Sequence, residues 1–284
     1  MKNMRAIKAR IKSVENTRQI TRSMKTVASS KLKKTQQAMA PMREFASKCA
    51  GVMSGLSAAA SVDNPLLEKR EAEKVCFVLC VGNRGLCGGY NSSLLRYAAA
   101  LSDEENLEHF FVVCGNWGKD AIAAAKLDVR KTFEVSDVPE FSQAEEVSDY
   151  LKELFISRDA DKIVFVYEKF VSVLSQQPSS KVLLPLSVES GGAEERDIIF
   201  EPDQKGIMDQ LTDMYLKNSV YSVFLEARTG EHAARMTAMT SASDNTEELI
   251  AELQLELNHA RQAAITTEVS EITGGAEALR SAHS

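Results

Sequence analysis

The stretch "IKARIKSVENTRQITRSMKTVASSKLKKTQ", from Ile7 to Gln36, decides the fold class of this chain. Apolar residues recur in it at alternating spacings of three and four, which is the repeat of a left-handed coiled coil. With Met4 at position a, twelve of the sixteen a and d positions up to Leu56 are apolar. We therefore expect a helix of roughly 57 residues, about 85 Å long, with a bend at Pro41, since proline removes a backbone hydrogen bond.

The heptad pattern is interrupted at three consecutive a and d positions. These are Arg18, Thr21 and Lys25, and the apolar residues nearby are Ile20, Met24 and Val27. We expect the apolar stripe to rotate toward the second set. Drift of an irregular coiled coil and a change of partner explain this rotation equally well.

The partner of this helix is expected at the other end of the chain. No proline follows Pro202, and the residues from Gly206 to Leu279 are rich in helix formers. Their apolar positions repeat at three and four, as at Ile250, Leu253, Leu257, Ala260 and Ala264. Residues 1–48 carry a net charge of +11, from 13 Lys and Arg and 2 Glu, whereas residues 210–284 carry −6. Matching stripes and opposite charges predict an antiparallel pair.

The middle of the chain has the pattern of an α/β domain. Strands are predicted at 75–81, 110–114, 127–133, 162–170 and 181–187, and helices at 91–102, 117–126 and 142–157. This alternation indicates a mainly parallel sheet with helices on its faces. The predicted organisation is a coiled-coil helix over 1–60, an inserted Rossmann-like α/β domain over 70–200, and a second coiled-coil helix over 206–284.

A glycine-rich loop, "VGNRGLCGGYN" from Val81 to Asn91, follows the first predicted strand. Such a loop could cradle a phosphate, and a nucleotide-dependent enzyme is one hypothesis. The loop lacks both the Gly-Lys-Ser/Thr of a phosphate loop and the spacing of a dinucleotide fingerprint. A structural turn that uses glycine for positive φ or close packing is the favoured interpretation.

Composition narrows the remaining function classes. The five cysteines are an odd number lying mostly in or beside apolar runs, which indicates reduced, buried thiols rather than a disulfide framework. The four histidines show no metal-ligand spacing, and no apolar run reaches the ~20 residues that cross a bilayer. The basic arm could bind nucleic acid, but residues 1–44 contain no aromatic residue for base stacking. A solvated helix surface that faces a partner is favoured instead.

Three segments resemble the gamma subunit of F-type ATP synthases. They are Ile7–Gln36, "RGLCGGYN" from Arg84 to Asn91, and the block from His232 to Leu279 that begins "HAARMTAMTSASDN". The resemblance extends over nearly the whole chain and is weak between about 120 and 195. It implies an antiparallel coiled coil around an α/β insert that serves as a central rotor shaft. In that family, catalysis belongs to the alpha and beta subunits, so this chain is expected to be non-catalytic and to bind no cofactor or metal itself.

The resemblance also implies partners and contact residues. The expected partners are the alpha and beta subunits, the epsilon subunit and the membrane ring of c subunits, with no nucleic acid. Beta-subunit contacts are expected at Met24, Arg235, Gln262, Thr266 and Glu268, an apical bearing at Val269, Ile272, Ala276 and Leu279, and a foot near the c-ring at Phe200, Glu201 and Asp203. Arg235 is expected on an exposed helix surface that tolerates substitution.

One departure from the family concerns redox control. Chloroplast-type members carry an inserted cysteine pair, and this chain has no cysteine after Cys114. We therefore expect a bacterial subunit, attached through its partners to the cytoplasmic face of the inner membrane. The absence of a transit peptide before Met1 points the same way.

Overall fold

The computed structural model describes residues 4–59, 64–105, 107–117, 122, 127–187 and 204–282. They fall into two compact units: the first combines the chain up to Thr26 with the chain from Ala238, and the second is Val27–Thr237. Two long helices, α1 (Met4–Ala59) and α5 (Gln204–Ala282), contribute to both units. None of the helices within the described ranges has the length and apolarity needed to cross a membrane.

The first unit is a two-helix seam formed by the beginning of α1 and the end of α5. Its interior contains Ile7 of α1 with Met239, Ile250 and Leu253 of α5, all less than a tenth exposed. The buried and half-buried positions of α5 recur at three and four as far as Thr267, as a coiled-coil seam requires. Arg22 and Glu247 join the two helices by an exposed ion pair of 3.4 Å, which adds little stability.

The heptad frame of α1 continues where the sequence suggested an interruption. Thr21 is 8% exposed and Arg18 is half-buried, whereas Ile20 is 60% exposed. The Thr21 hydroxyl donates to the backbone oxygen of Arg18 at 3.0 Å, so this polar group needs no solvent. The predicted rotation of the stripe is therefore wrong at these positions. Only Lys25 leaves the seam, and Met24 beside it is half-buried.

The second unit contains the α/β domain. Its five strands are β1 (Lys74–Cys80), β2 (Glu108–Cys114), β3 (Val129–Phe133), β4 (Lys162–Ser172) and β5 (Ser175–Leu184). They form one sheet in the order β3-β2-β1-β4-β5. The first four are parallel, and β5 is antiparallel to β4. The prediction of a mainly parallel sheet is confirmed.

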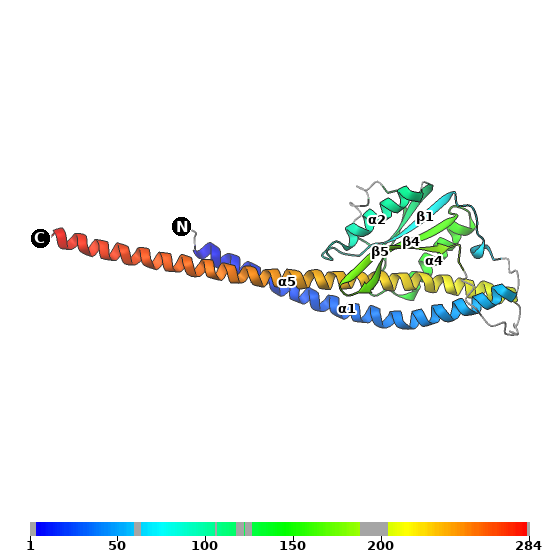
Figure 1. Ribbon diagram of the computed structural model, residues 1–284, viewed down its shortest axis with the longest axis horizontal. Coiled ribbons are helices and arrows are strands. Elements are labelled where there is room, and N and C mark those ends of the chain that lie inside the picture. The colour runs from blue at the N-terminus through cyan, green and yellow to red at the C-terminus, as the bar shows by residue number, and fades with distance from the viewer. Residues whose placement is uncertain are drawn as a thin grey trace. The chain divides into compact units, whose positions relative to one another are not determined.

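Helices cover both faces of this sheet (Figure 1). One face packs on α2 (Tyr90–Glu105), whose Leu94 and Ala98 are fully buried against β1, β2 and β4. The other face packs on α4 (Phe141–Ile156) and on α5. The α5 residues in this core are Leu216, Val220, Val223, Phe224 and Ala227. Their three- and four-residue spacing places them on one side of the helix.

In this unit too, α1 runs beside α5, in the opposite direction. The Thr229 side-chain oxygen of α5 lies 3.3 Å from the Met39 sulfur of α1. Further along α1, Met42 lines a surface groove together with Met214, which is earlier in α5. The paired residues rise in number along α1 and fall along α5, so the two helices are antiparallel, as predicted. Val27, which was expected to join the apolar stripe, is 54% exposed.

Two predicted elements differ from the structure or lie outside it. Strand β5 begins at Ser175, six residues before the predicted start, because its first half is a mostly half-buried edge of serine, glutamine and proline without apolar alternation. Most of the predicted helix 117–126 lies outside the described residues.

Helix α1 continues through Pro41, and the short 3-10 helix η1 (Pro65–Leu67) precedes β1.

Candidate functional site

The glycine-rich loop after β1 is shaped as a turn and directs its carbonyl groups at α5. Leu86 and Gly88 have positive φ values of 61° and 60°, and α2 begins directly after the loop at Tyr90. The backbone N–H of Gly82 donates to the Asn91 side chain at 2.8 Å. A phosphate site needs free N–H groups, whereas three carbonyl groups of this segment accept hydrogen bonds from arginines of α5. This geometry supports the structural interpretation of the loop.

Arg228 of α5 connects this loop to the segment after β3. The residue is 3% exposed, and its guanidinium group donates to four acceptors. They are the backbone oxygens of Val81 at 3.1 Å and Val135 at 2.8 Å, the Asn83 side-chain oxygen at 2.9 Å and the Glu231 carboxylate at 2.6 Å. A planar guanidinium can bind such divergent acceptors simultaneously, which a lysine ammonium on its flexible stem cannot do in the same geometry.

Glu231, one turn further along α5, lies between two arginines. It is 1% exposed and forms ion pairs with Arg228 at 2.6 Å and Arg235 at 2.5 Å. Burial alone would raise its pKa, but the charges of the two arginines outweigh burial and hold the pKa below its ordinary value. The space around it is full, since a Cβ on Gly82 would lie 2.9 Å from the Glu231 carboxyl carbon.

His232 extends this cluster toward α1. Its Nε2 lies 2.7 Å from the backbone oxygen of Asp137, which can only accept, so Nε2 carries the hydrogen. Its Nδ1 then accepts from Arg235 at 3.4 Å. Burial lowers the pKa of His232, consistent with this neutral form. The Asp137 carboxylate pairs with Lys31 of α1, and this bond helps to lower the pKa of Asp137 against the opposing effect of burial.

We call this cluster the polar junction. It consists of Arg228, Glu231, His232 and Arg235 of α5, the loop 81–87, the segment 135–137 and Lys31 of α1. The junction lies at the carboxyl ends of β1 and β3, where open α/β sheets bind ligands. Here those positions are filled by side chains of the chain's own helix. The arrangement fastens the sheet to both long helices.

A second buried carboxylate lies beside the junction, at Glu168 of β4. Glu168 is 1% exposed, and one of its oxygens accepts from the Ser93 hydroxyl at 2.5 Å. Its other oxygen, Oε2, is buried without a hydrogen-bond partner among the described residues. Burial raises the pKa of Glu168, opposed by the Ser93 hydrogen bond. Helix α5 approaches closely here, because its residue 230 is glycine.

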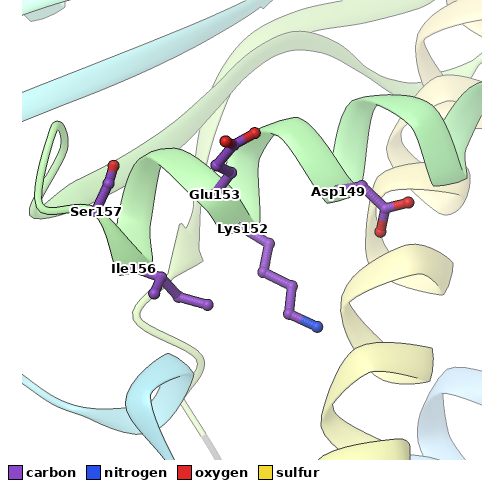
Figure 2. A pocket seen from close by; sticks show the side chains of 5 residues that line it. All are labelled: Asp149, Lys152, Glu153, Ile156 and Ser157. Carbon is purple, nitrogen blue, oxygen red and sulfur yellow. The ribbon is translucent and has the colours of Figure 1, made fainter.

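The surface pockets gather no catalytic constellation among the described residues. A pocket of about 400 Å³ is lined by one side of α4, from which Lys152 and Ile156 extend in the same direction (Figure 2). The Lys152 ammonium is held by Asp213 at 2.5 Å. Within the described ranges, no three His, Cys, Asp or Glu side chains could hold a metal ion together. The five cysteines are buried and free, as the sequence predicts.

The expected contact residues fall into two environments. Gln262, Thr266, Glu268, Val269, Ile272 and Ala276 are exposed on α5, and Met24 is half-buried on α1. Arg235 differs, because its side chain is only 11% exposed and bonds to Glu231 and to the loop. The expectation of an exposed, tolerant site at Arg235 is therefore wrong. The side chain of Leu279 and the residues Phe200, Glu201 and Asp203 lie outside what the structure describes.

Sequence reasoning missed most of the polar junction, including Arg228, Glu231 and His232. A signal was present in the spacing of α5. Its apolar face runs through Phe224 and Ala227, and the next position on that face is Glu231. Charged residues that continue the buried face of a helix must find partners, so they mark a site.

Comparisons with known proteins agree with this architecture. Residues 3–279 match the family model described as ATP synthase. The chain is 39% identical to the ATP synthase gamma chain of Desulforamulus reducens, with 98% of this chain and all of the relative covered. It is 38% identical to the ATP synthase gamma chain of Desulfitobacterium hafniense, with the same coverage.

Solved structures show the same fold. A chain of the Euglena gracilis mitochondrial ATP synthase OSCP/F1/c-ring structure matches with a TM-score of 0.72 and 19% identity, covering 99% of this chain and 96% of that chain. The Tetrahymena thermophila central stalk/c-ring structure matches with a TM-score of 0.62 and 22% identity, covering 79% and 99%. The predicted fold class is confirmed. By its sequence matches, the chain belongs to the ATP synthase gamma-chain family.

Proposed function

We propose that this chain is the central rotor shaft of an F-type ATP synthase. It couples ion flow through a membrane ring of c subunits to conformational cycling of catalytic sites on alpha and beta subunits. The chain is non-catalytic by itself, and nucleotide and Mg²⁺ are bound by its partners. It associates with the cytoplasmic face of the inner membrane peripherally, through those partners.

The observation that carries this proposal is the free end of α5. All residues from Glu268 to Ala276 are exposed, including Val269 at 54% and Ile272 at 71%. The buried seam stops at Thr267, so this part of the helix has no covering element among the described residues. Exposed apolar side chains on a long helix indicate a surface that a partner covers.

The contact residues proposed for this role follow the exposed surface. Gln262, Thr266 and Glu268 would contact a beta subunit, with Met24 at a second contact. Val269, Ile272, Ala276 and Leu279 would form the apical bearing, and Phe200, Glu201 and Asp203 the foot, next to the c-ring and the epsilon subunit. Asymmetric contacts of this kind let a turning shaft stabilise different conformations at each catalytic site.

Co-expression with alpha and beta subunits of a related enzyme tests the proposal. A tag on this chain is expected to retain both subunits through size-exclusion chromatography, and ATP hydrolysis is expected only in that complex. The control is the isolated chain at the same concentration. Hydrolysis by the isolated chain, or failure to retain either subunit, would contradict the proposal.

A further inference from the structure

Helix α5 is attached to the α/β domain in two chemically different ways. From Leu216 to Ala227 its inner side is apolar and packs on the sheet and α4. From Arg228 onward the inner side is charged and hydrogen-bonded to the loops after β1 and β3. The change occurs between two consecutive residues, Ala227 and Arg228, at the carboxyl ends of the strands.

These two attachments resist rotation of the helix to different degrees. Apolar burial is nondirectional, so a helix can turn slightly on an apolar face while most of the buried area is kept. Hydrogen bonds weaken steeply when the angle at the hydrogen departs from linearity. The bonds of the polar junction therefore supply most of the buried directional resistance to twisting of α5, beside the Tyr90 hydroxyl that donates to the Ala227 backbone oxygen at 2.8 Å.

We infer that Arg228 and Glu231 are positioning residues that lock α5 to the sheet against rotation about the helix axis. The inference rests on the proposed rotor function, because a shaft transmits torque only if its α/β domain and its long helix turn together. Neither residue is assigned a contact with substrate or with a partner subunit. Their role is to hold two parts of one chain in register under load.

The geometry of Arg228 explains why this lock is stiff. Its acceptors come from three separate places: the loop at Val81 and Asn83, the segment at Val135, and α5 itself at Glu231. Rotation of α5 would withdraw the guanidinium from both loops at once. It would also leave the buried backbone oxygens of Val81 and Val135 without a donor, which is costly in a protein interior, whereas the Arg228–Glu231 pair would move with the helix.

Glu231 holds the side chain of Arg228 in this conformation. Its carboxylate holds Arg228 on one side and Arg235 on the other, and Arg235 donates to the loop oxygens of Arg84 and Gly85 at 3.2 and 3.4 Å. Both arginines are thus oriented toward the loop by one buried anion. The loop therefore accepts hydrogen bonds from Arg228 at its beginning and from Arg235 at its centre.

The test uses the Arg228→Lys variant in the complete complex, reconstituted in membrane vesicles. Lysine keeps a positive charge beside Glu231 but loses the planar group that reaches both loops. ATP hydrolysis measured with an uncoupler is expected to stay close to the wild-type value. Ions pumped per ATP hydrolysed are expected to fall severalfold. An unchanged pumping ratio would overturn the inference.

An engineered disulfide between α5 and β5 distinguishes the loss of the Arg228 contacts from a general folding defect. A Cβ on Gly230 would lie 3.6 Å from the Cγ of Gln176 in β5, so Gly230→Cys and Gln176→Cys place two thiols near each other; Gly230→Cys alone is the control for the contact of its Cβ with the Glu168 backbone oxygen at 3.4 Å. In the Arg228→Lys background, oxidation of this pair is expected to restore the pumping ratio, and reduction to remove it again. A formed disulfide that restores nothing would overturn the inference.

Lys152→Met provides the matched control. It removes another cation that joins α4 to α5, through Asp213, but one that is about a third exposed. Its pumping ratio is expected to match the wild type; a loss as large as that of Arg228→Lys would contradict a specific role for the junction. The proposed function fails separately, if the wild-type chain forms no pumping complex. If the wild type pumps ions and Arg228→Lys pumps equally well, only the inference about Arg228 and Glu231 is contradicted.

Discussion

Two stretches of the same helix, 228–235 and 268–276 of α5, have opposite environments. The first buries Arg228 and Glu231 almost completely and bonds them to two loops. The second exposes all its residues, apolar ones included. Both are continuous α-helix. The difference shows that a long helix can serve as fixed structure at one place and as free contact surface at another.

Removing the anion of the junction should have the largest effect on stability. Glu231→Met leaves Arg228 and Arg235 without their shared partner, at a cost of about 3–5 kcal/mol in the free energy of unfolding. Urea unfolding of the full chain measures it. Glu268→Met, at the free end, is the control and should change the value by no more than about 0.5 kcal/mol.

A double variant sharpens this prediction. Arg228→Met combined with Glu231→Met removes the most buried cation together with the anion and leaves only the less buried Arg235 without its carboxylate, so it should recover part of the stability lost by Glu231→Met alone. If the double variant were as unstable as the sum of its single variants, buried unpaired charge would not be the cause. A cavity or lost backbone hydrogen bonds would then dominate.

Replacing glycine by alanine should lower stability in the α/β domain and raise it at the free end of α5. Gly115 has a φ of 129°, and a Cβ there would lie 2.2 Å from the Val81 oxygen. Gly115→Ala should therefore cost more than about 2 kcal/mol. Gly274 on α5 has nothing within 4 Å, and Gly274→Ala should stabilise the local helix by up to about 1 kcal/mol. Thermal unfolding tests the first, and hydrogen exchange of nearby amides tests the second.

The two buried carboxylates should respond to pH in opposite directions. Burial raises the pKa of Glu168 in the folded chain, so its stabilising contribution is complete below the unfolded pKa and is lost as pH rises through the folded pKa. The pKa of Glu231 is lowered, so its contribution is lost as pH falls. Tyr90, which faces both groups, titrates only at higher pH because burial raises its pKa.

Unfolding free energies between pH 4 and pH 8 distinguish these contributions. Glu168→Gln cannot ionise, so its stability relative to the wild type should rise with pH across this range. Glu231→Gln should show the reverse trend only at the acidic end of this range, losing stability relative to the wild type as pH rises toward the unfolded pKa of Glu231 and staying level above it. Parallel pH profiles for the wild type and Glu168→Gln would mean that Glu168 is not the responsive group.

The smallest effect on stability is expected at the free end. Ile272→Asp should change the unfolding free energy of the full chain by no more than about 0.5 kcal/mol, because the side chain is 71% exposed. Its retention of alpha and beta subunits should nevertheless weaken. Equal retention by wild type and variant, measured by pull-down at several salt concentrations, would remove Ile272 from the bearing.

The sequence predicts much of the fold and little of the polar junction. Heptad spacing locates both long helices, since apolar residues at three and four can be buried only along one side of a helix. Buried runs locate β1, β2 and β4 to within two residues. The spacing does not reveal that Thr21 stays in the seam, because a hydroxyl bonded to its own helix can be buried. The polar edge of β5 also escapes a pattern that relies on apolar residues.

Local sequence by itself determined the antiparallel helix pair, the parallel sheet and the glycine turn after β1, since these follow from periodicity, charge and backbone freedom. Only the tertiary structure decided that Arg235 is held inward and that Arg228 and Glu231 fill the carboxyl edge of the sheet. A charged residue on a helix looks the same in sequence whether it is solvated or buried. Its role depends on partners from distant segments, and folding alone brings Val81, Val135 and Glu231 within reach of one guanidinium.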